Sequence, residues 1–243
     1  MFFDKRYIYI ILAVLVMSSL ASMTRGDVLS LLLTLPAVLI AIVFHEFAHA
    51  WMADKLGDTT PRAQGRLTLN PLAHLDPLGT VLLIFAHVGW GKPVEINPNN
   101  FTSNKSRSAC EALVSFAGPA MNFMLAIILS FVYVLLNNLA PITFLYSFVG
   151  EIIGILLFMT ITVNIGLGVF NLIPLPPLDG EKIFRHILPY RAQEWLDRNA
   201  QILNIIFMAL WITGLLGTVV SPVITVIENG IFWLVNTVVG IFL

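Results

Sequence analysis

Long apolar segments separated by short polar ones make up most of the chain. Six of them are long enough to cross a hydrocarbon core about 30 Å thick as helices. They are residues 7–23, 28–53, 110–136, 148–172, 201–220 and 223–243. The pattern predicts an all-α multi-pass membrane protein with about six transmembrane helices. We expect residues 1–243 to form a single membrane-embedded domain, in which residues 7–23 are kept as a helix and not removed as a signal peptide.

A shorter apolar segment, residues 78–88, has about 11 residues, too few to cross the membrane as a helix. Residues 89–98 follow, with β-type residues interrupted by Gly and Pro. We therefore expect a short re-entrant β-like hairpin. Non-helical backbone is tolerated at membrane depth only beside protein or water, so the hairpin also indicates a cavity.

Composition and charge placement agree with a membrane protein. The chain is 58% hydrophobic and 11% charged, whereas soluble domains carry about 25% charged residues. A net charge of −1 without a basic arm excludes a nucleic-acid partner, and the one cysteine excludes an internal disulfide. If the N-terminus is cytoplasmic, 12 of the 13 lysines and arginines lie on the cytoplasmic side, and Arg25 is the exception. We expect a plasma-membrane protein embedded in the lipid bilayer.

A metal-binding pattern lies in the last third of the segment 28–53. The sequence His45-Glu46-Phe47-Ala48-His49 places two imidazoles on one helix face, where both can reach one metal ion. Glu46 lies close enough to act on a metal-bound water. Lys55 follows His49 by six residues, about 9 Å of helix rise. The site is therefore expected inside the membrane near its cytoplasmic surface; the alternative is a polar patch satisfied by neighbouring helices.

A catalytic zinc site needs a third protein ligand. Asp179 is favoured because the prolines at 174, 176 and 177 end the helix 148–172 at the same depth as the histidines. His87 is the alternative, since the re-entrant element should also approach the cavity. We expect His74 and Asp76 to cap turns. His186 and Glu151 are expected at the membrane interfaces.

Three motifs in this order resemble the site-2 protease family of intramembrane metalloproteases. They are His45-Glu46-x-x-His49, Gly118-Pro119-x-x-Asn122 and Asn171-x-x-Pro174-x-x-x-Leu178-Asp179-Gly180. The resemblance covers residues 28–189, which would be the catalytic core, with flanking helices 7–23, 201–220 and 223–243. It is closest to the compact bacterial and archaeal type, in which Gly89-Trp90-Gly91-Lys92-Pro93 also recurs.

The resemblance implies a role for each motif residue. His45, His49 and Asp179 would hold one Zn²⁺, and Glu46 would be the general base. Asn171 and Asn122 would bind the substrate backbone or the developing oxyanion. Hydrogen bonding between membrane helices is the alternative role for both asparagines.

The substrate implied is the transmembrane segment of another membrane protein. Trp90 and Val94 lie in the strand-like segment, which could offer an edge to an extended substrate. The sequence thus predicts an intramembrane zinc metalloprotease. The alternatives are a different membrane zinc peptidase, a membrane metal transporter and a non-proteolytic metal-binding membrane protein.

Overall fold

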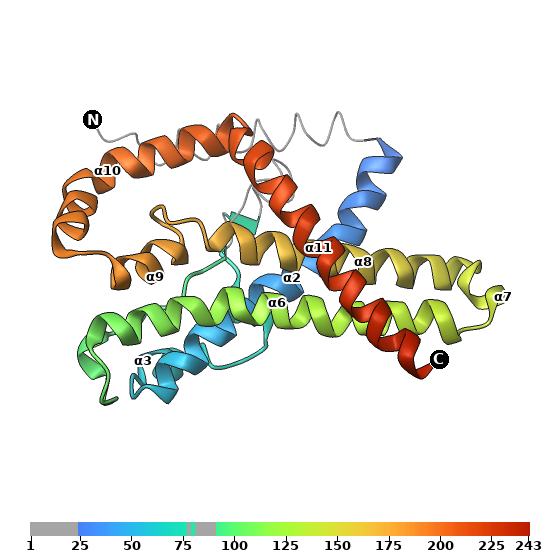
Figure 1. Cartoon of the computed structure of the whole chain (residues 1–243), viewed down its shortest axis with the longest axis horizontal. Coiled ribbons are helices and arrows are strands. Elements are labelled where there is room, and N and C mark those ends of the chain that lie inside the picture. The colour runs from blue at the N-terminus through green and yellow to red at the C-terminus, as the bar shows by residue number, and fades with distance from the viewer. Residues whose placement is uncertain (1–23, 77–78, 81–90) are drawn as a thin grey trace.

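A computed structural model describes residues 24–76, 79–80 and 91–243 (Figure 1). These described residues form helices joined by short loops, and they contain no β-strand. In chain order the helices are α2 (Arg25–Lys55), α3 (Thr60–Ala63), α4 (Pro71–His74), the 3₁₀ helix η1 (Pro98–Asn100), α6 (Arg107–Leu139), α7 (Ile142–Leu145), α8 (Phe148–Asn171), α9 (Asp179–Ile187), α10 (Tyr190–Ile212) and α11 (Leu215–Phe242).

The centre of the fold is a packed set of long helices. Helices α6 and α8 run side by side and are joined by the short α7, while α2 packs on both of them and α11 lies across them (Figure 1). Their shared core is apolar and includes Ala126 from α6, Ile161 and Ile165 from α8, and Val235 from α11. Because α2 crosses α6 and α8, its histidine face is covered by protein and not by lipid.

Four of the described helices are long and apolar enough to cross a membrane: Leu31–Lys55, Arg107–Leu139, Phe148–Asn171 and Leu215–Phe242. The predicted segments 28–53, 110–136 and 148–172 coincide with α2, α6 and α8, each end within about three residues. The all-helical class is confirmed. The expected total of six spans is not, and the predicted span 7–23 lies outside the described residues.

The predicted boundary between the last two spans is wrong. We expected spans at 201–220 and 223–243, but α10 ends at Ile212 and α11 already begins at Leu215. Gly214 separates them with φ +74°, a left-handed conformation that glycine adopts without strain. Pro222, where the sequence indicated a break, lies inside α11. The first half of α10 is charged, so α10 is not among the four candidate spans.

The predicted β-like hairpin is not confirmed. Among the described residues, 91–97 are extended without forming a strand, apart from one isolated bridge between Leu75 and Gly91. Trp90, His87 and most of the apolar stretch before them lie outside the described residues.

Two buried side chains hold the extended segment 91–97 in place. The Arg66 guanidinium donates to the backbone carbonyls of Lys92 (2.8 Å) and Pro93 (2.6 Å). At the other end, the Asp58 carboxylate is 0% exposed and accepts from the Asn97 N–H at 2.6 Å. The backbone N–H of Lys92 also donates to the carbonyl of His74 at 2.8 Å. The segment is therefore fixed at both ends.

The predicted unwinding after α8 is present. Helix α8 ends at Asn171, an irregular segment carries the three prolines, and α9 starts at Asp179. The turn is tight: a Cβ added at Gly180 would lie 2.3 Å from the carbonyl oxygen of Ile173. The missing Cβ of Gly180 lets the first residues of α9 lie directly against the end of α8. In this position Asp179 points back toward α2.

Candidate metal centre

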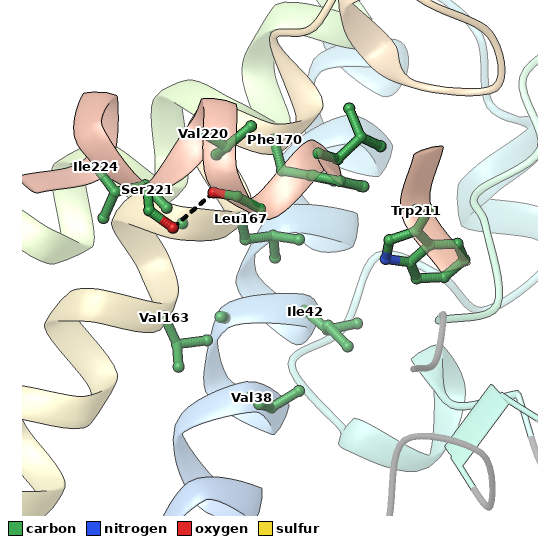
Figure 2. Close-up of a pocket in the computed structure, with 13 residues that line it drawn as sticks. Val38, Ile42, Val163, Leu167, Phe170, Trp211, Val220, Ser221 and Ile224 are labelled. Carbon is green, nitrogen blue, oxygen red and sulfur yellow. Dashed lines mark hydrogen bonds between the residues drawn. The ribbon is translucent and has the colours of Figure 1, made fainter. Parts of the chain in front are cut away.

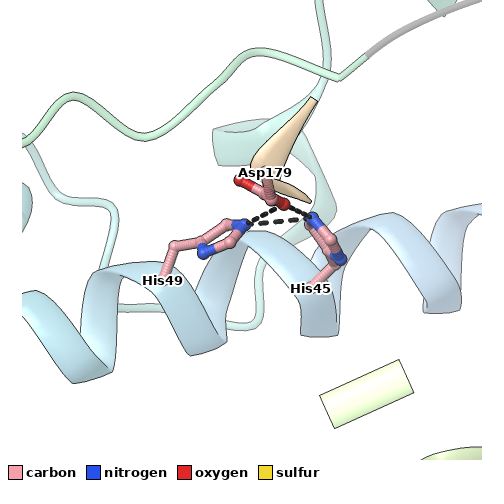
Figure 3. Close-up of side chains that lie close together, drawn as sticks. All are labelled: His45, His49 and Asp179. Atoms are coloured by element: carbon pink, nitrogen blue, oxygen red, sulfur yellow. Dashed lines mark hydrogen bonds and ion pairs between the residues drawn. The ribbon is translucent and has the colours of Figure 1, made fainter. Parts of the chain in front are cut away.

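Three side chains from two distant parts of the chain meet at one point (Figure 3). Nε2 of His45 and Nε2 of His49 are 3.0 Å apart, and each lies 3.1 Å from Oδ2 of Asp179. The histidines are 5% and 8% exposed. A tetrahedral site with metal–ligand bonds of about 2.0–2.1 Å requires ligand atoms about 3.3 Å apart, so the triangle has the size that zinc needs.

The hydrogen bonds of the opposite ring nitrogens show which way each imidazole is protonated. Nδ1 of His45 lies 2.6 Å from Oδ1 of Asn122, and Nδ1 of His49 lies 2.7 Å from the carbonyl oxygen of Val114. The Asn122 amide nitrogen itself donates elsewhere, so both partner atoms are acceptors and both Nδ1 atoms carry the proton. Neutral imidazoles then present the Nε2 lone pair to the centre. Two lone pairs and a carboxylate oxygen at this distance repel each other unless a cation lies between them.

Asp179 enters the triangle as a carboxylate. It lies in the first turn of α9, where the helix dipole favours a negative charge. Burial alone would raise the pKa of the Asp179 carboxyl, but when no metal is bound the charge and Nε2–H hydrogen bonds of protonated imidazoles outweigh burial and hold that pKa below its usual range. A cation bound between neutral imidazoles would act on the carboxyl in the same direction. The third donor is therefore anionic at neutral pH, the form in which a carboxyl group binds zinc.

Asn122 belongs to a buried polar network between helices. It is 0% exposed, donates to the carbonyl of Ala41 at 3.1 Å and to Oδ1 of Asn164 at 2.9 Å, and accepts from His45. Asn164 in turn donates to the carbonyl of Thr160. An outer partner of this kind sets the tautomer and the ring orientation of a metal-binding histidine. Asn122 contacts His45 in this way and does not line the cavity.

Gly118 leaves the space that the two imidazoles occupy. A Cβ at this position of α6 would lie 2.5 Å from Nε2 of His49 and 2.6 Å from Cε1 of His45. Real Cβ atoms do not approach so closely, and the rings are held by their hydrogen bonds. The glycine of the second motif therefore lets α6 pack directly against the histidine face of α2.

The three donors open onto a cavity of about 550 Å³, which we call the metal cavity. Its lining includes Glu46, Val94, Asn171 and Lys182 together with apolar side chains. Oε2 of Glu46 accepts a hydrogen bond from the backbone N–H of Val94 at 3.0 Å. Glu46 thus lies beside the donor triangle with its carboxylate oriented by the extended segment.

Asn171, at the end of α8, lines the metal cavity, and its amide donates to the carbonyl of Leu167 at 3.0 Å. Of the hairpin pair, Val94 lines the same cavity, while Trp90 and the alternative ligand His87 lie outside the described residues. The structure thus brings together His45, Glu46, His49, Asp179, Asn171 and Val94 around one space.

The remaining candidates lie away from the donor triangle. His74 is 0% exposed and bonds through Nε2 to the carbonyl of Thr68 at 2.7 Å, so it is a buried residue at the end of α4 and not a turn cap. Asp76 does cap a turn, accepting from the N–H of Gly79 at 2.8 Å. His186 is exposed and contacts Ser108. Glu151 is exposed in the first turn of α8.

Sequence reasoning missed Glu228. It lies in the middle of α11 and accepts a hydrogen bond from the Thr162 hydroxyl of α8 at 3.2 Å. A single carboxylate in an apolar helix of 28 residues was signal enough, because ionisable groups at that depth are rare. Asp58 and Arg66 were missed as well, because the groups of the segment 91–97 that they bind are distant from them in sequence.

Comparison with known proteins places the chain among metallopeptidases. The family model for "Peptidase family M50" matches residues 33–154 and 146–214. A protein named "Putative zinc metalloprotease YwhC", from Bacillus subtilis, is 36% identical over 203 residues, which are 83% of this chain and 90% of that protein. "Putative zinc metalloprotease Rip2" from Mycolicibacterium smegmatis is 34% identical over 155 residues, 61% of this chain and 54% of that protein. No solved structure matches the chain.

Proposed function

The chain belongs to peptidase family M50, and on this premise we propose that it is a zinc metalloendopeptidase that cuts a membrane protein within or near its transmembrane segment. The donor triangle carries the proposal. Two neutral imidazoles and one carboxylate meet at zinc-ligand spacing beside a glutamate, in a protein whose described residues include four helices long and apolar enough to cross a membrane. Three protein ligands leave a fourth position open, which is the pattern of a catalytic site and not of a structural one.

His45, His49 and Asp179 would hold the zinc. When bound, zinc lowers the pKa of a coordinated water to about 7 and so supplies a nucleophile at neutral pH. Glu46 takes a proton from the attacking water and passes it to the leaving amine. The Val94 N–H restricts the Glu46 carboxylate to one orientation while this happens.

The depth of the site supports cleavage close to the membrane surface. His49 precedes Lys55 by six residues on α2, about 9 Å along the helix. Water reaches this depth through the polar and charged lining of the metal cavity, which includes Lys182. We place this face, and the N-terminus, on the cytoplasmic side of the plasma membrane, on the basis of the lysine and arginine distribution.

An extended substrate fits the segment 91–97. Pro93, Val94 and Ile96 line the metal cavity, and the segment is held at both ends by Arg66 and Asp58. A substrate strand laid along it would bring a peptide bond past Glu46, because Val94 contacts that carboxylate. The Val94 N–H already serves Glu46, so the substrate must pair with other backbone groups of the segment. Trp90 belongs to the same proposed docking edge on sequence grounds alone.

The test separates metal binding from proteolysis. Wild type, His45→Ala, Glu46→Gln and Asp179→Asn are purified in detergent, and their zinc content and cleavage of a transmembrane substrate are measured. We expect His45→Ala to lose zinc and Asp179→Asn to bind it more weakly. Glu46→Gln should keep zinc and lose at least about 100-fold in rate.

Three results would contradict the proposal. Full zinc retention in Asp179→Asn would remove that residue from the ligand set and favour His87. Unimpaired cleavage by Glu46→Gln would remove the general base. Zinc binding by a wild type that cleaves no membrane segment would favour a non-proteolytic metal-binding protein.

A further inference from the structure

A second cavity, of about 410 Å³, lies among α2, α8 and the start of α11 (Figure 2). We call it the apolar pocket. Its volume is within the range of about 300–1,000 Å³ that is usual for ligand sites. Its lining residues are Val38, Ala41, Ile42, Val163, Gly166, Leu167, Phe170, Trp211, Leu216, Gly217, Val220, Ser221 and Ile224.

The apolar pocket lies next to the metal cavity. Four side chains line both spaces, namely Ile42, Leu167, Phe170 and Trp211. Figure 2 labels all four of these side chains; Ile42 lies on the same helix as Val38, and Trp211 comes from a separate segment. The two spaces therefore share a wall made of these four residues.

The pocket has no charged group among its lining residues. Ser221 is the one hydroxyl, and it donates to the carbonyl of Gly217 in its own helix at 2.7 Å. An occupant gains no ion pair there and finds no side-chain hydroxyl free to bond it. The chemistry matches aliphatic and aromatic side chains, which make up a transmembrane segment.

The pocket lies deeper in the membrane than the metal donors. Val38 and Ile42 precede His45 on α2 by seven and three residues, about 10 and 4.5 Å of helix rise. An extended chain covers about 3.3–3.6 Å per residue. A peptide whose bond is cut at the metal thus reaches the pocket two or three residues away, on its membrane-embedded side.

We propose that the apolar pocket is a specificity site of the peptidase, which receives one large apolar side chain of the substrate two or three residues from the cut bond, on the membrane-embedded side. The inference rests on the proposed function. The wall that the pocket shares with the metal cavity favours the substrate as its occupant over a lipid chain, since a chain held at the metal already extends to that wall.

The glycines of the pocket allow it to be filled without disturbing the fold. A Cβ at Gly166 of α8 would meet only Ile224, at an ordinary contact distance of 3.6 Å, and one at Gly217 of α11 would meet nothing within 4 Å. Each helix also offers a matched control outside the lining, because Gly154 of α8 and Gly230 of α11 have nothing within 4 Å.

The experiment uses the full-length protein in detergent and two substrates that carry Leu or Ala at the position in question, with rates compared as kcat/KM. Wild type should prefer Leu by at least about 10-fold, the usual discrimination of an apolar pocket. Gly166→Leu and Gly217→Leu should each reduce this preference to about 1-fold while zinc content stays at the wild-type level. Gly154→Leu and Gly230→Leu should keep the preference.

Three results would contradict the proposed specificity site. They are a wild type without size preference, filled variants that retain the preference, and control variants that lose it as the filled ones do. If the filled variants kept the preference for Leu over Ala, a lipid chain would be the better candidate for the occupant of the pocket.

A binding measurement distinguishes failure of the pocket from failure of the proposed function. Glu46→Gln is mixed with a substrate carrying a photoreactive phenylalanine at the same position, and the cross-linked peptides are sequenced. Cross-links at Val38 or Ile224 support the pocket even if wild type cleaves nothing, a result that would count against proteolysis alone. Cross-links confined to residues outside the pocket would contradict the proposal that the substrate side chain enters it.

Discussion

The two cavities share four side chains, yet they are built in opposite ways. Around the metal donors, polar groups are buried and each ring nitrogen has a defined partner, as with His45 on Asn122 and His49 on Val114. The apolar pocket contains no interaction of this kind between helices. Its space comes from small residues, Ala41, Gly166 and Gly217 among them.

The difference follows from what each space has to do. A metal site must hold three donors within a few tenths of an ångström, and only directional hydrogen bonds and close packing achieve that. A pocket that selects an apolar side chain needs volume and an uncharged wall, which non-directional contacts supply. Substitutions that add volume should therefore act very differently in the two places.

The largest expected effect is that of one methyl group at Gly118 compared with one at Gly166. Gly118→Ala places a Cβ 2.5 Å from Nε2 of His49, so at least one imidazole must move. We expect zinc to be lost or held more weakly and activity to fall by roughly 100-fold, as for a misplacement of about 1 Å. Gly166→Ala should leave zinc content unchanged. Equal zinc content in both variants, measured by elemental analysis, would remove the contrast between the cavities.

Asn122 offers the next largest effect. Asn122→Ala removes the acceptor that fixes the His45 ring, and loss of such an outer partner costs about 10- to 100-fold in metal affinity or activity. Zinc affinity measured by competition with a chelator should show this loss. Asn171→Ala is the comparison, since Asn171 bonds to Leu167 and to neither histidine, and should leave the affinity unchanged. The reverse order would place Asn171, and not Asn122, in support of the metal.

Asp58 holds one end of the segment 91–97, which lines the metal cavity, and its contribution to stability should depend on pH. Hydrogen bonds from Thr60, Asn97 and Asn100 outweigh the effect of burial and lower the pKa of the Asp58 carboxyl. A lowered pKa stabilises the fold above the unfolded value of about 3.9, and the stabilisation is lost as pH falls through the folded value.

Asp58→Asn should therefore reduce the free energy of unfolding by about 1–3 kcal/mol at pH 7, and the difference should shrink only below about pH 4. Thermal unfolding across this range measures it. The Leu-to-Ala preference of wild type should meanwhile stay constant between about pH 5 and 8, because no titratable side chain lines the apolar pocket. A difference that vanished above about pH 5 would contradict the lowered pKa of Asp58.

Glu228 should give the smallest effect. Glu228→Gln keeps an oxygen able to accept from the Thr162 hydroxyl. We expect the free energy of unfolding to change by less than about 0.5 kcal/mol, as at positions where no interaction is lost. Zinc content and substrate preference should also be unchanged. A 10-fold loss of cleavage would show that the charge itself has a role, and Glu228→Leu would then separate charge from hydrogen bonding.

Local patterns predicted the elements that depend on neighbours in the chain. The 3.6-residue period placed His45 and His49 on one face, apolar runs located α2, α6 and α8, and three prolines marked the end of α8. The same reasoning misplaced the boundary between the last two helices: the predicted break at residues 221–222 lies inside α11, and Gly214 separates α10 from α11. Proline is tolerated inside a membrane helix when its neighbours satisfy the freed carbonyl, whereas a left-handed glycine ends the helix directly.

The sequence by itself determined the donor types, the all-helical class and the positions of α2, α6 and α8, because composition, spacing and helical period are properties of adjacent residues. The tertiary structure decided that Asn122 orients His45, that Gly118 admits both imidazoles, and that Ile42, Leu167, Phe170 and Trp211 divide a metal cavity from an apolar pocket. These facts depend on which face of one helix meets which face of another. Side-chain packing between helices sets that choice, and no spacing along the chain records it.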